Sequence, residues 1–449
     1  MKKARIFIFA LVLVCIFCSC KPQEELVSST PVINTTSEQI STSSEVKDKK
    51  PSKVSSSASK NSNSTVSSKE NNTSSKNNGS STISTSSENN TTNENPNTVN
   101  KDNQLKICYQ QLTQKQKSIY NALEKAVKEM QTGWINLETP VFENYRRDIN
   151  VVVTALQNDM PQYFWLPPAY YTGNSQNGET IRILFEGQDD LTYLIDKSQK
   201  AQMEKELSNK VHEITSQVTA TTPFEIELQL HDILCQNVTY VRNDSDPLKY
   251  TAYGALVKGS AVCEGYSRAM QLLLAQYGIK STLVTGKADN IGHMWNLVYI
   301  ENAWYHLDAT WNDLENGQVS HTYFNLTDSE ISKDHGRYVT HSQLSYDEIV
   351  CETPAPYNFE LPICNKSDNN YFVKKDYIYG PNDEEKIAKL LMKPFNIIEF
   401  KFSNDAFRVQ FDSEKEYRLV TINEILSKEK SDFRISKYTM TPTTIIIYK

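Results

Sequence analysis

Three residues of this sequence, Cys263, His293 and Asp308, are of the types and in the order that thiol chemistry requires. A thiol is a strong nucleophile only as the thiolate, so it needs a base nearby, and the base needs a third group that fixes its tautomer. The cysteine stands in Ala-Val-Cys-Glu-Gly-Tyr-Ser, the histidine in Gly-His-Met-Trp-Asn and the aspartate in Trp-Tyr-His-Leu-Asp-Ala-Thr-Trp-Asn-Asp. The order predicts a cysteine nucleophile, a histidine base and an aspartate that orients the histidine.

A helix is expected to carry the cysteine. Residues 263–277 have apolar side chains at helical spacings of three and four, and Gly278 follows where helices commonly end. The apolar residues of this stripe are Met270, Leu273, Leu274 and Tyr277. Cys263 would then lie at the helix N-terminus, a position at which the helix dipole and unpaired N–H groups favour a thiolate.

A hairpin is expected to carry the other two residues. Residues 293–300 and 303–308 are rich in aromatic and β-branched residues, and the Glu-Asn dipeptide between them predicts a two-residue turn. In that register His293 and Asp308 are diagonal neighbours on one face of the hairpin. Diagonal side chains are about 7–8 Å apart at Cβ, which is within reach of a hydrogen bond between imidazole and carboxylate.

Together the three strings resemble the transglutaminase-like superfamily, whose core is a papain-like arrangement of a cysteine on a helix with a histidine and an aspartate on adjacent strands. The resemblance is strongest over about Tyr250–Asp313, where Cys-Glu-Gly-Tyr, His-x-Trp-Asn and Trp-Tyr-x-x-Asp-x-Thr-Trp occur in the family's order. Residues 112–161 and the C-terminal third are less specifically similar to the flanks of bacterial secreted members. The resemblance implies that Cys263 is the nucleophile, His293 the general base and acid, and Asp308 the orienting residue.

The resemblance implies acyl transfer from an amide through a Cys263 thioester to a second acceptor. Water as that acceptor would make the protein a peptidase or amidase, and an amine would make it a crosslinking enzyme. In well-known members an aromatic side chain upstream of the cysteine helps to hold the oxyanion, and both Tyr250 and Tyr253 qualify here. The expected partner is a peptide or protein substrate, with cell-wall peptide as one option, and no cofactor is expected. The alternative is an inactive scaffold that serves as a cell-surface binding or adhesion protein.

The N-terminus indicates export and a lipid anchor. Met-Lys-Lys-Ala-Arg precedes an apolar run over 6–17, too short for a comfortable transmembrane helix, and Cys20 follows a small residue. Phe-Cys-Ser-Cys resembles a bacterial lipobox, which implies a signal peptide over 1–20 and a lipid on Cys20. The expected location is the extracellular face of the cell membrane of a bacterium of the Gram-positive type, where the lipid would anchor the protein. An ordinary secretory signal with incidental cysteines is the alternative.

Residues 21–103 predict a disordered stalk. They consist of Ser, Thr, Asn and Lys with scattered acids and almost no aromatic residues. Such a segment cannot bury enough apolar surface to offset the entropy lost on ordering. A flexible chain of about 80 residues has an r.m.s. reach of roughly 50 Å, which suits a stalk that lifts a domain from a membrane.

The remaining sequence predicts an α+β fold: a helical subdomain over 104–220, a catalytic domain over 221–350 and a small α/β domain over 351–449. A capping box at Thr113-x-x-Gln116 opens the first helix. Other periodic patterns predict helices near 143–156, 197–218, from 223 and over 384–392, and strands over 181–186, 371–379, 395–402 and 443–448.

Other polar residues give weaker signals. Cys351 and Cys364 surround a proline-bearing loop and are the expected disulfide of an exported protein, worth about 3 kcal/mol if unstrained. His321 and His335 flank a polar loop and are expected at the solvated surface, and no histidine shows a spacing such as H-E-x-x-H, so no metal is expected. The net charge of −7 is mild and spread out, which gives nucleic-acid binding no electrostatic basis.

Overall fold

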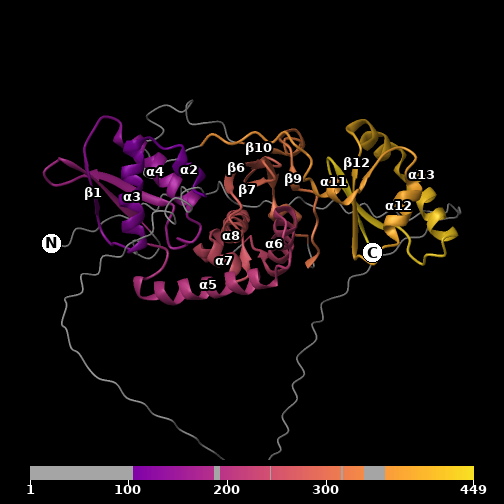
Figure 1. The fold of residues 1–449 in the computed structure, drawn as a ribbon, viewed down its shortest axis with the longest axis horizontal. Coiled ribbons are helices and arrows are strands. Elements are labelled where there is room, and N and C mark those ends of the chain that lie inside the picture. Colours follow the sequence, from indigo (N-terminus) through magenta and orange to yellow (C-terminus); the bar gives the residue numbers. More distant parts are fainter. Residues whose placement is uncertain (1–104, 187–192, 243, 315–316, 338–358) are drawn as a thin grey trace, which may run out of the picture. The chain divides into compact units, whose positions relative to one another are not determined.

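The computed structural model of the chain describes residues 105–186, 193–242, 244–314, 317–337 and 359–449. The predicted signal peptide with Cys20, the predicted stalk and Cys351 lie outside these residues. The described parts combine helices with mostly antiparallel sheets, as the α+β prediction expects (Figure 1). Within them, no helix is both long and apolar enough to cross a membrane.

The N-terminal part contains helices and a small sheet. Its helices are α2 (Ile107–Gln110), α3 (Gln114–Lys128), α4 (Tyr145–Asp159), the 3-10 turn η1 (Lys197–Gln199) and α5 (Lys200–Gln217). Its strands are β1 (Ile135–Pro140), β2 (Ala169–Asn174) and β3 (Thr180–Glu186), in the antiparallel order β1-β3-β2. The capping box at Thr113 and Gln116 forms as predicted. The sequence patterns indicated only β3, so this part is less purely helical than expected.

The central part is built around one sheet. Its strands are β6 (Ser281–Ala288), β7 (Ile291–Ile300), β8 (Ala303–Leu307), β9 (Phe324–Leu326) and β10 (His335–Arg337), in the antiparallel order β10-β6-β7-β8-β9. Its helical elements are α6 (Pro223–Asn237), η2 (Pro247–Tyr250), α7 (Ala252–Leu256), α8 (Cys263–Gln276), α9 (Ala309–Asn312) and α10 (Asp328–Ile331), and a short β4 (Thr239–Tyr240) pairs with β5 (Ser260–Ala261). The predicted cysteine helix is α8, and it packs against β6 and β7 (Figure 1).

The predicted hairpin forms in the predicted register. Ile300 pairs with Ala303 across a two-residue turn, and both turn residues have positive φ, 46° at Glu301 and 68° at Asn302. Two consecutive positive φ values are typical of the type I′ turn, whose twist matches that of the flanking strands. The second strand is one residue shorter than expected, because β8 ends at Leu307 and a helical turn follows.

The C-terminal part has a sheet and a hydrophobic core of its own. Its sheet has the order β11-β12-β14-β13, formed by β11 (Ile378–Tyr379), β12 (Ile397–Phe402), β13 (Lys437–Met440) and β14 (Thr444–Tyr448). Its helices are α11 (Tyr371–Lys375), α12 (Glu384–Leu391) and α13 (Asp405–Lys428). The strands expected over 395–402 and 443–448 and the helix expected over 384–392 are confirmed.

One predicted strand of this part is wrong. Residues 371–379 begin as helix α11 and end in the two-residue strand β11. The Asn370 side chain accepts a hydrogen bond from the Phe372 N–H and so caps the helix, and Asp376 ends it in the left-handed conformation with φ 57°. The strand-like aromatic composition of this segment therefore loses to a local cap. Helix α13 was not predicted, although its buried residues lie on one helical stripe.

Candidate active site

Cys263 is the first residue of helix α8, and its side chain is buried with 1% relative exposure. The glycine two residues later explains how the chain reaches this position. A Cβ on Gly265 would lie 2.5 Å from the Lys249 carbonyl oxygen and 2.7 Å from the Ala261 Cβ. The Cys-Glu-Gly-Tyr string therefore needs glycine there, because the first turn of α8 packs directly on the backbone before it.

Two other motif residues fix α8 against strand β7. The Ser267 hydroxyl lies 2.9 Å from the Cys263 carbonyl oxygen and 3.0 Å from the Met294 carbonyl oxygen. The Asn296 amide donates to the Ser267 carbonyl at 3.0 Å. These buried bonds join the cysteine helix to the strand that carries His293, and buried polar groups must be paired in this way to be tolerated.

His293 and Asp308 form the contact that the hairpin register predicts. The imidazole Nε2 lies 2.6 Å from Asp308 Oδ2, and both side chains are buried. The second carboxylate oxygen of Asp308 accepts the backbone N–H groups of Thr310 at 2.9 Å and Trp311 at 3.2 Å. Asp308 is thus the N-cap of α9 rather than the last residue of a strand, and this cap orients its carboxylate toward the histidine.

The electrostatics of this pair favour a charged imidazole. Burial alone lowers the pKa of His293, but the charge and the hydrogen bond of Asp308, with a further contribution from Cys263, outweigh it and raise this pKa to about 10. Burial would raise the pKa of Asp308, but the neighbouring histidines hold it well below its usual range. The buried Nδ1 of His293 has no hydrogen-bond partner in the described part of the chain.

A second histidine, His335, binds the same carboxylate. Its Nε2 lies 3.1 Å from Asp308 Oδ2, and its Nδ1 lies 2.6 Å from Asp334 Oδ1. The hydroxyl of Tyr323 donates to the other oxygen of Asp334 at 2.7 Å. Burial lowers the pKa of His335, but its two carboxylate partners outweigh this and raise it. Asp308 therefore stands between two imidazoles.

The sequence reasoning placed His335 and His321 at the solvated surface, and both placements are wrong. The residues are buried, with relative exposures of 4% and 9%. Polar neighbours in sequence suggested solvent, but the imidazoles are covered by carboxylates and aromatic rings from elsewhere in the chain. One feature of the sequence could have indicated that His335 is buried, namely Gly286, which lies on strand β6 opposite the strand that carries His335. A Cβ on Gly286 would collide with the Gly336 carbonyl and with the Trp295 ring, so glycine there lets β10 approach β6.

Aromatic rings enclose the two imidazoles. The Trp295 ring stacks on His293 with centroids 5.8 Å apart, and the Trp311 ring lies 4.5 Å from that of His335. The indole N–H of Trp295 donates to Nδ1 of His306 at 2.9 Å, which fixes the indole in place. Low polarity around the pair strengthens its electrostatic interactions.

The remaining motif residues have structural roles. The Tyr266 hydroxyl lies 2.6 Å from Asp313 Oδ2, so the last aspartate of the third string binds the tyrosine of the first and not His293. Of the two tyrosines considered as oxyanion donors, Tyr253 directs its hydroxyl to Glu206 on α5. The ring of Tyr250 has the Lys249 ammonium 5.2 Å from its centroid.

Cys364 is buried and forms no disulfide with another described residue. Because Cys351 lies outside the described residues, its pairing with Cys364 stays a prediction.

Three groups of described side chains bring potential metal ligands close together: His231, Asp232 and His321; His293, Asp308 and His335; and His306, Asp328 and Cys364.

Solved structures with limited similarity to this chain include a TGase, at 14% identity with a TM-score of 0.24, covering 40% of this chain and 50% of that one. A predicted cysteine protease from Cytophaga hutchinsonii matches at 16% identity with a TM-score of 0.21, covering 34% of this chain and 65% of that one. A predicted protease from Parabacteroides distasonis matches at 10% identity with a TM-score of 0.18, covering 32% and 36%. The chain thus spans half the length of the TGase that it matches.

No curated protein matches the chain. A sequence model of a protein family does match, over residues 210–309, and its description is the transglutaminase-like superfamily. Cys263, His293 and Asp308 all lie inside the matched range, whereas His335 lies beyond it. The α+β fold, with a cysteine helix packed on a mostly antiparallel sheet, agrees with this assignment. The chain therefore carries a domain of the transglutaminase-like superfamily at residues 210–309.

Proposed function

We propose that this domain is a cysteine acyl-transfer enzyme that acts on amide-linked acyl groups. The Cys263 thiolate attacks the amide carbonyl, and backbone N–H groups at the start of α8 stabilise the oxyanion. His293 then gives its Nδ1 proton to the nitrogen that leaves as an amine, and the C–N bond breaks to give a thioester. Asp308 keeps the imidazole charged and correctly turned for this transfer.

The thioester then needs an acceptor, which decides the reaction. Water gives an acid and makes the protein a peptidase or amidase, while an amine gives a new amide and makes it a crosslinking enzyme. In either case His293 removes a proton from the acceptor, and the Cys263 sulfur leaves as the thiolate that began the cycle. We propose a peptide or protein as substrate, and the cycle as written requires no cofactor.

The observation that best supports the proposal is the state of His293. Its Nε2 is held 2.6 Å from a buried carboxylate, its Nδ1 is buried without another hydrogen-bond partner among the described residues, and Cys263 contributes to its raised pKa. An imidazolium beside a thiol favours the thiolate, which is the nucleophilic form.

Selective alkylation tests this proposal. Iodoacetamide at neutral pH should label Cys263 faster than Cys108 and Cys364, because burial raises the pKa of Cys108 well above its usual range and that of Cys364 to about 12. Mass spectrometry of the digested protein would locate the label, and a Cys263→Ala variant is the control. Labelling of Cys263 no faster than an unactivated thiol would contradict the proposal.

A second candidate function is an inactive scaffold for binding or adhesion at the cell surface. One observation favours it: Cys263 and His293 have relative exposures of only 1% and 0%, so a substrate must displace protein atoms to reach the sulfur. The scaffold predicts that a small alkylating reagent and a bulky peptide-like acyl probe both fail to modify Cys263. The enzyme predicts that the peptide-like probe reacts and that excess peptide substrate competes with it.

We also propose that a lipid on Cys20 holds the protein at the extracellular face of a bacterial cell membrane, with residues 21–103 as a stalk. The support for this comes from the sequence of the N-terminus, which combines basic residues, a short apolar run and a lipobox-like string. On this basis the substrate would be a peptide or protein outside the cytoplasm, with cell-wall peptide as one option.

A further inference from the structure

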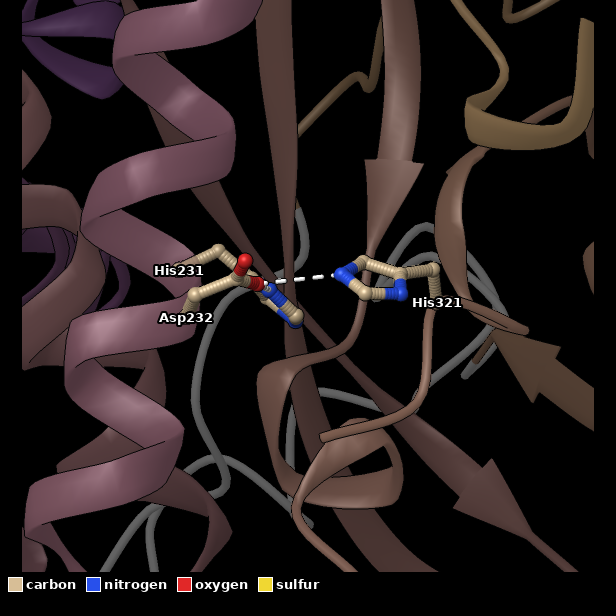
Figure 2. Close-up of side chains that lie close together, drawn as sticks. All are labelled: His231, Asp232 and His321. Carbon is tan, nitrogen blue, oxygen red and sulfur yellow. Dashed lines mark hydrogen bonds and ion pairs between the residues drawn. The ribbon is translucent and has the colours of Figure 1, made fainter. Parts of the chain in front are cut away.

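Helix α6 and the segment before strand β9 bring a second carboxylate between two imidazoles. His231 and Asp232 are consecutive on α6, and His321 faces them from the other side (Figure 2). Asp232 Oδ1 lies 2.8 Å from Nδ1 of His231 and 3.1 Å from Nε2 of His321. The ligand atoms that these three residues offer all lie within 4.8 Å of one another.

A further carboxylate lies behind His321. Oε1 of Glu399, on strand β12, is 3.0 Å from the other ring nitrogen, Nδ1 of His321. The same carboxylate accepts the His321 backbone N–H at 2.9 Å and the Ser320 hydroxyl at 2.6 Å, so its position is fixed. A histidine that binds a metal ion usually donates its other ring N–H to a carboxylate, which sets its tautomer and strengthens it as a ligand. His321 has this partner.

The charges and separations of the cluster suit a divalent cation. Burial lowers the pKa of His321, but Asp232 and Glu399 outweigh this and raise it to about 9 without metal, so binding of a cation would release its proton. With both imidazoles then neutral, the carboxylates of Asp232 and Glu399 would carry two negative charges, which one divalent ion would balance. Zinc binds nitrogen and oxygen at about 2.0–2.2 Å, which places tetrahedral ligands about 3.3 Å from one another. The separations of 2.8 Å and 3.1 Å from Asp232 Oδ1 to the two imidazoles need to widen by only a few tenths of an ångström, and the ligand atoms that the three residues offer lie within 4.8 Å of one another. Asp232 is one-third exposed, at 33%, so an ion can enter without unfolding the domain.

We propose that His231 Nδ1, Asp232 Oδ1 and His321 Nε2 form a binding site for a transition-metal ion of the zinc class, with water completing the coordination. Imidazole nitrogens favour zinc and its neighbours over magnesium or calcium, which prefer oxygen ligands. The ion joins α6 to the segment before β9 and, through Glu399, to β12. It is a structural tether and takes no part in the chemistry at Cys263.

Binding changes the tautomer of His231. Without metal, Asn312 Nδ2 lies 3.1 Å from His231 Nε2, while Asn312 Oδ1 accepts the Tyr323 N–H at 2.9 Å. This arrangement fixes the amide and places the His231 proton on Nδ1, pointing at Asp232. A metal ion on Nδ1 moves that proton to Nε2, where the sulfur of Cys235 lies 3.6 Å away as an acceptor. The site therefore exchanges the Asn312 hydrogen bond for a metal–nitrogen bond.

The other two groups of potential ligands are poorer sites. In the group of His306, Asp328 and Cys364, the Arg337 guanidinium lies 3.0 Å from His306 Nε2, so a resident cation already occupies the position. In the group of His293, Asp308 and His335, the Asp308 carboxylate is saturated by two imidazoles and two backbone N–H groups. In the α6 group the Asp232 side chain is one-third exposed, and no lysine or arginine of the described residues forms an ion pair with it.

Zinc titration of the full-length, chelator-treated chain tests the proposal. Isothermal titration calorimetry should give one equivalent of bound Zn²⁺, and the melting temperature should rise with Zn²⁺ but not with Mg²⁺. A Cys263→Ala background removes the thiol as a competing ligand and should still bind. In that background Asp232→Asn should weaken binding by at least tenfold, and so should His321→Gln. Glu225→Gln is the matched control, because it neutralises a half-exposed acid on the same helix outside the cluster.

Co²⁺ gives a readout that does not depend on stability. Its visible absorption should appear on binding with a nitrogen and oxygen ligand set and should be lost in Asp232→Asn, provided that the far-UV circular dichroism of the variant matches that of the parent. Zinc binding that disappears with Cys263→Ala and persists in both cluster variants would overturn the proposal. Absence of any binding by the parent chain would also overturn it and leave a metal-free ion-pair network.

Discussion

The central part of the molecule contains two carboxylates that each stand between two histidines, and they differ in burial. Asp308, with 1% exposure, is shared by His293 and His335, while Asp232, with 33% exposure, is shared by His231 and His321. The same triplet of side chains therefore occurs once deep in the domain and once near its surface. The difference indicates that surroundings, more than residue types, decide what such a triplet can do.

At the buried triplet every hydrogen-bonding position of the carboxylate is used. Asp308 accepts two imidazoles on one oxygen and two backbone N–H groups on the other, so only the His293 Nδ1 is left for exchange with a ligand. This arrangement suits proton transfer to and from a thiol. At the triplet near the surface the Asp232 side chain is one-third exposed, and the Glu399 carboxylate lies behind His321. That arrangement suits a cation.

The largest expected effect is the loss of turnover from the buried triplet. Cys263→Ala and His293→Ala should each abolish acyl transfer, and the double variant should be no worse, because members of such a unit act together. Asp308→Asn should cost roughly 10⁴-fold, since an amide leaves the imidazole in the wrong tautomer. The measurement is release of amine or ammonia from a peptide amide. Near-parental activity in all three single variants would favour the scaffold function.

His335 should have a smaller effect, as a positioning residue. His335→Ala removes a charge-assisted hydrogen bond to Asp308, worth about 1.5–3 kcal/mol, so kcat/KM should fall about 10–100-fold. Loss of this neighbouring positive charge raises the pKa of His293 further, so the basic limb of the pH profile should move to higher pH.

The conservative variant and a control separate positioning from stability. His335→Gln can still donate to Asp308, so it should recover part of the rate while keeping the shifted limb. His212 is exposed on α5, and His212→Ala should change neither quantity. A lower melting temperature with an unchanged pH profile would mean that His335 only supports the fold.

A third carboxyl group, that of Glu227, sharpens the comparison, because no histidine of the described residues is hydrogen-bonded to it. Glu227 lies on α6 and is buried, and burial raises its pKa to about 8 although Asn325 donates to one of its oxygens at 2.8 Å. An acid whose folded pKa exceeds its unfolded value favours folding at low pH, and this contribution is lost as the pH rises from about 4.5 through 8. The loss should not exceed about 1.4 kcal/mol per pH unit.

Glu227→Gln should remove this dependence. The variant should match the parent near pH 4.5 and gain relative stability up to about pH 8, where the difference should level off. Urea unfolding at several pH values measures it, with Glu225→Gln on the same helix as the control. A difference that does not change with pH would mean that Glu227 stays charged in the folded protein.

Loss of the predicted lipid anchor should have the smallest effect on the two triplets. Cys20→Ser should release the protein from the membrane fraction or block its maturation, because the lipid on Cys20 is the anchor that the sequence indicates. Alkylation of Cys263 and binding of Zn²⁺ should both be unchanged. A processed Cys20→Ser protein that still sediments with membranes would contradict the anchor.

The sequence by itself determined the parts of the site that depend on local signals. The apolar stripe after Cys263 specifies a helix, and the Glu-Asn turn specifies the register that brings His293 and Asp308 together. Both follow from interactions between residues close in sequence, which a pattern of side chains encodes directly. The sequence patterns predicted a strand through Asp308 and did not indicate that this residue caps helix α9, because strands and short helical turns can share the same aromatic composition.

Only the tertiary structure decided which histidines are buried. His335 reaches Asp308 because β10 pairs with β6 across Gly286, and His321 meets Glu399 from a strand 78 residues further along the chain. Neither partner is within the reach of a periodic pattern, because the pairing of distant segments depends on how the whole sheet closes. A polar neighbourhood in sequence therefore predicted solvent at positions where the fold supplies buried carboxylates.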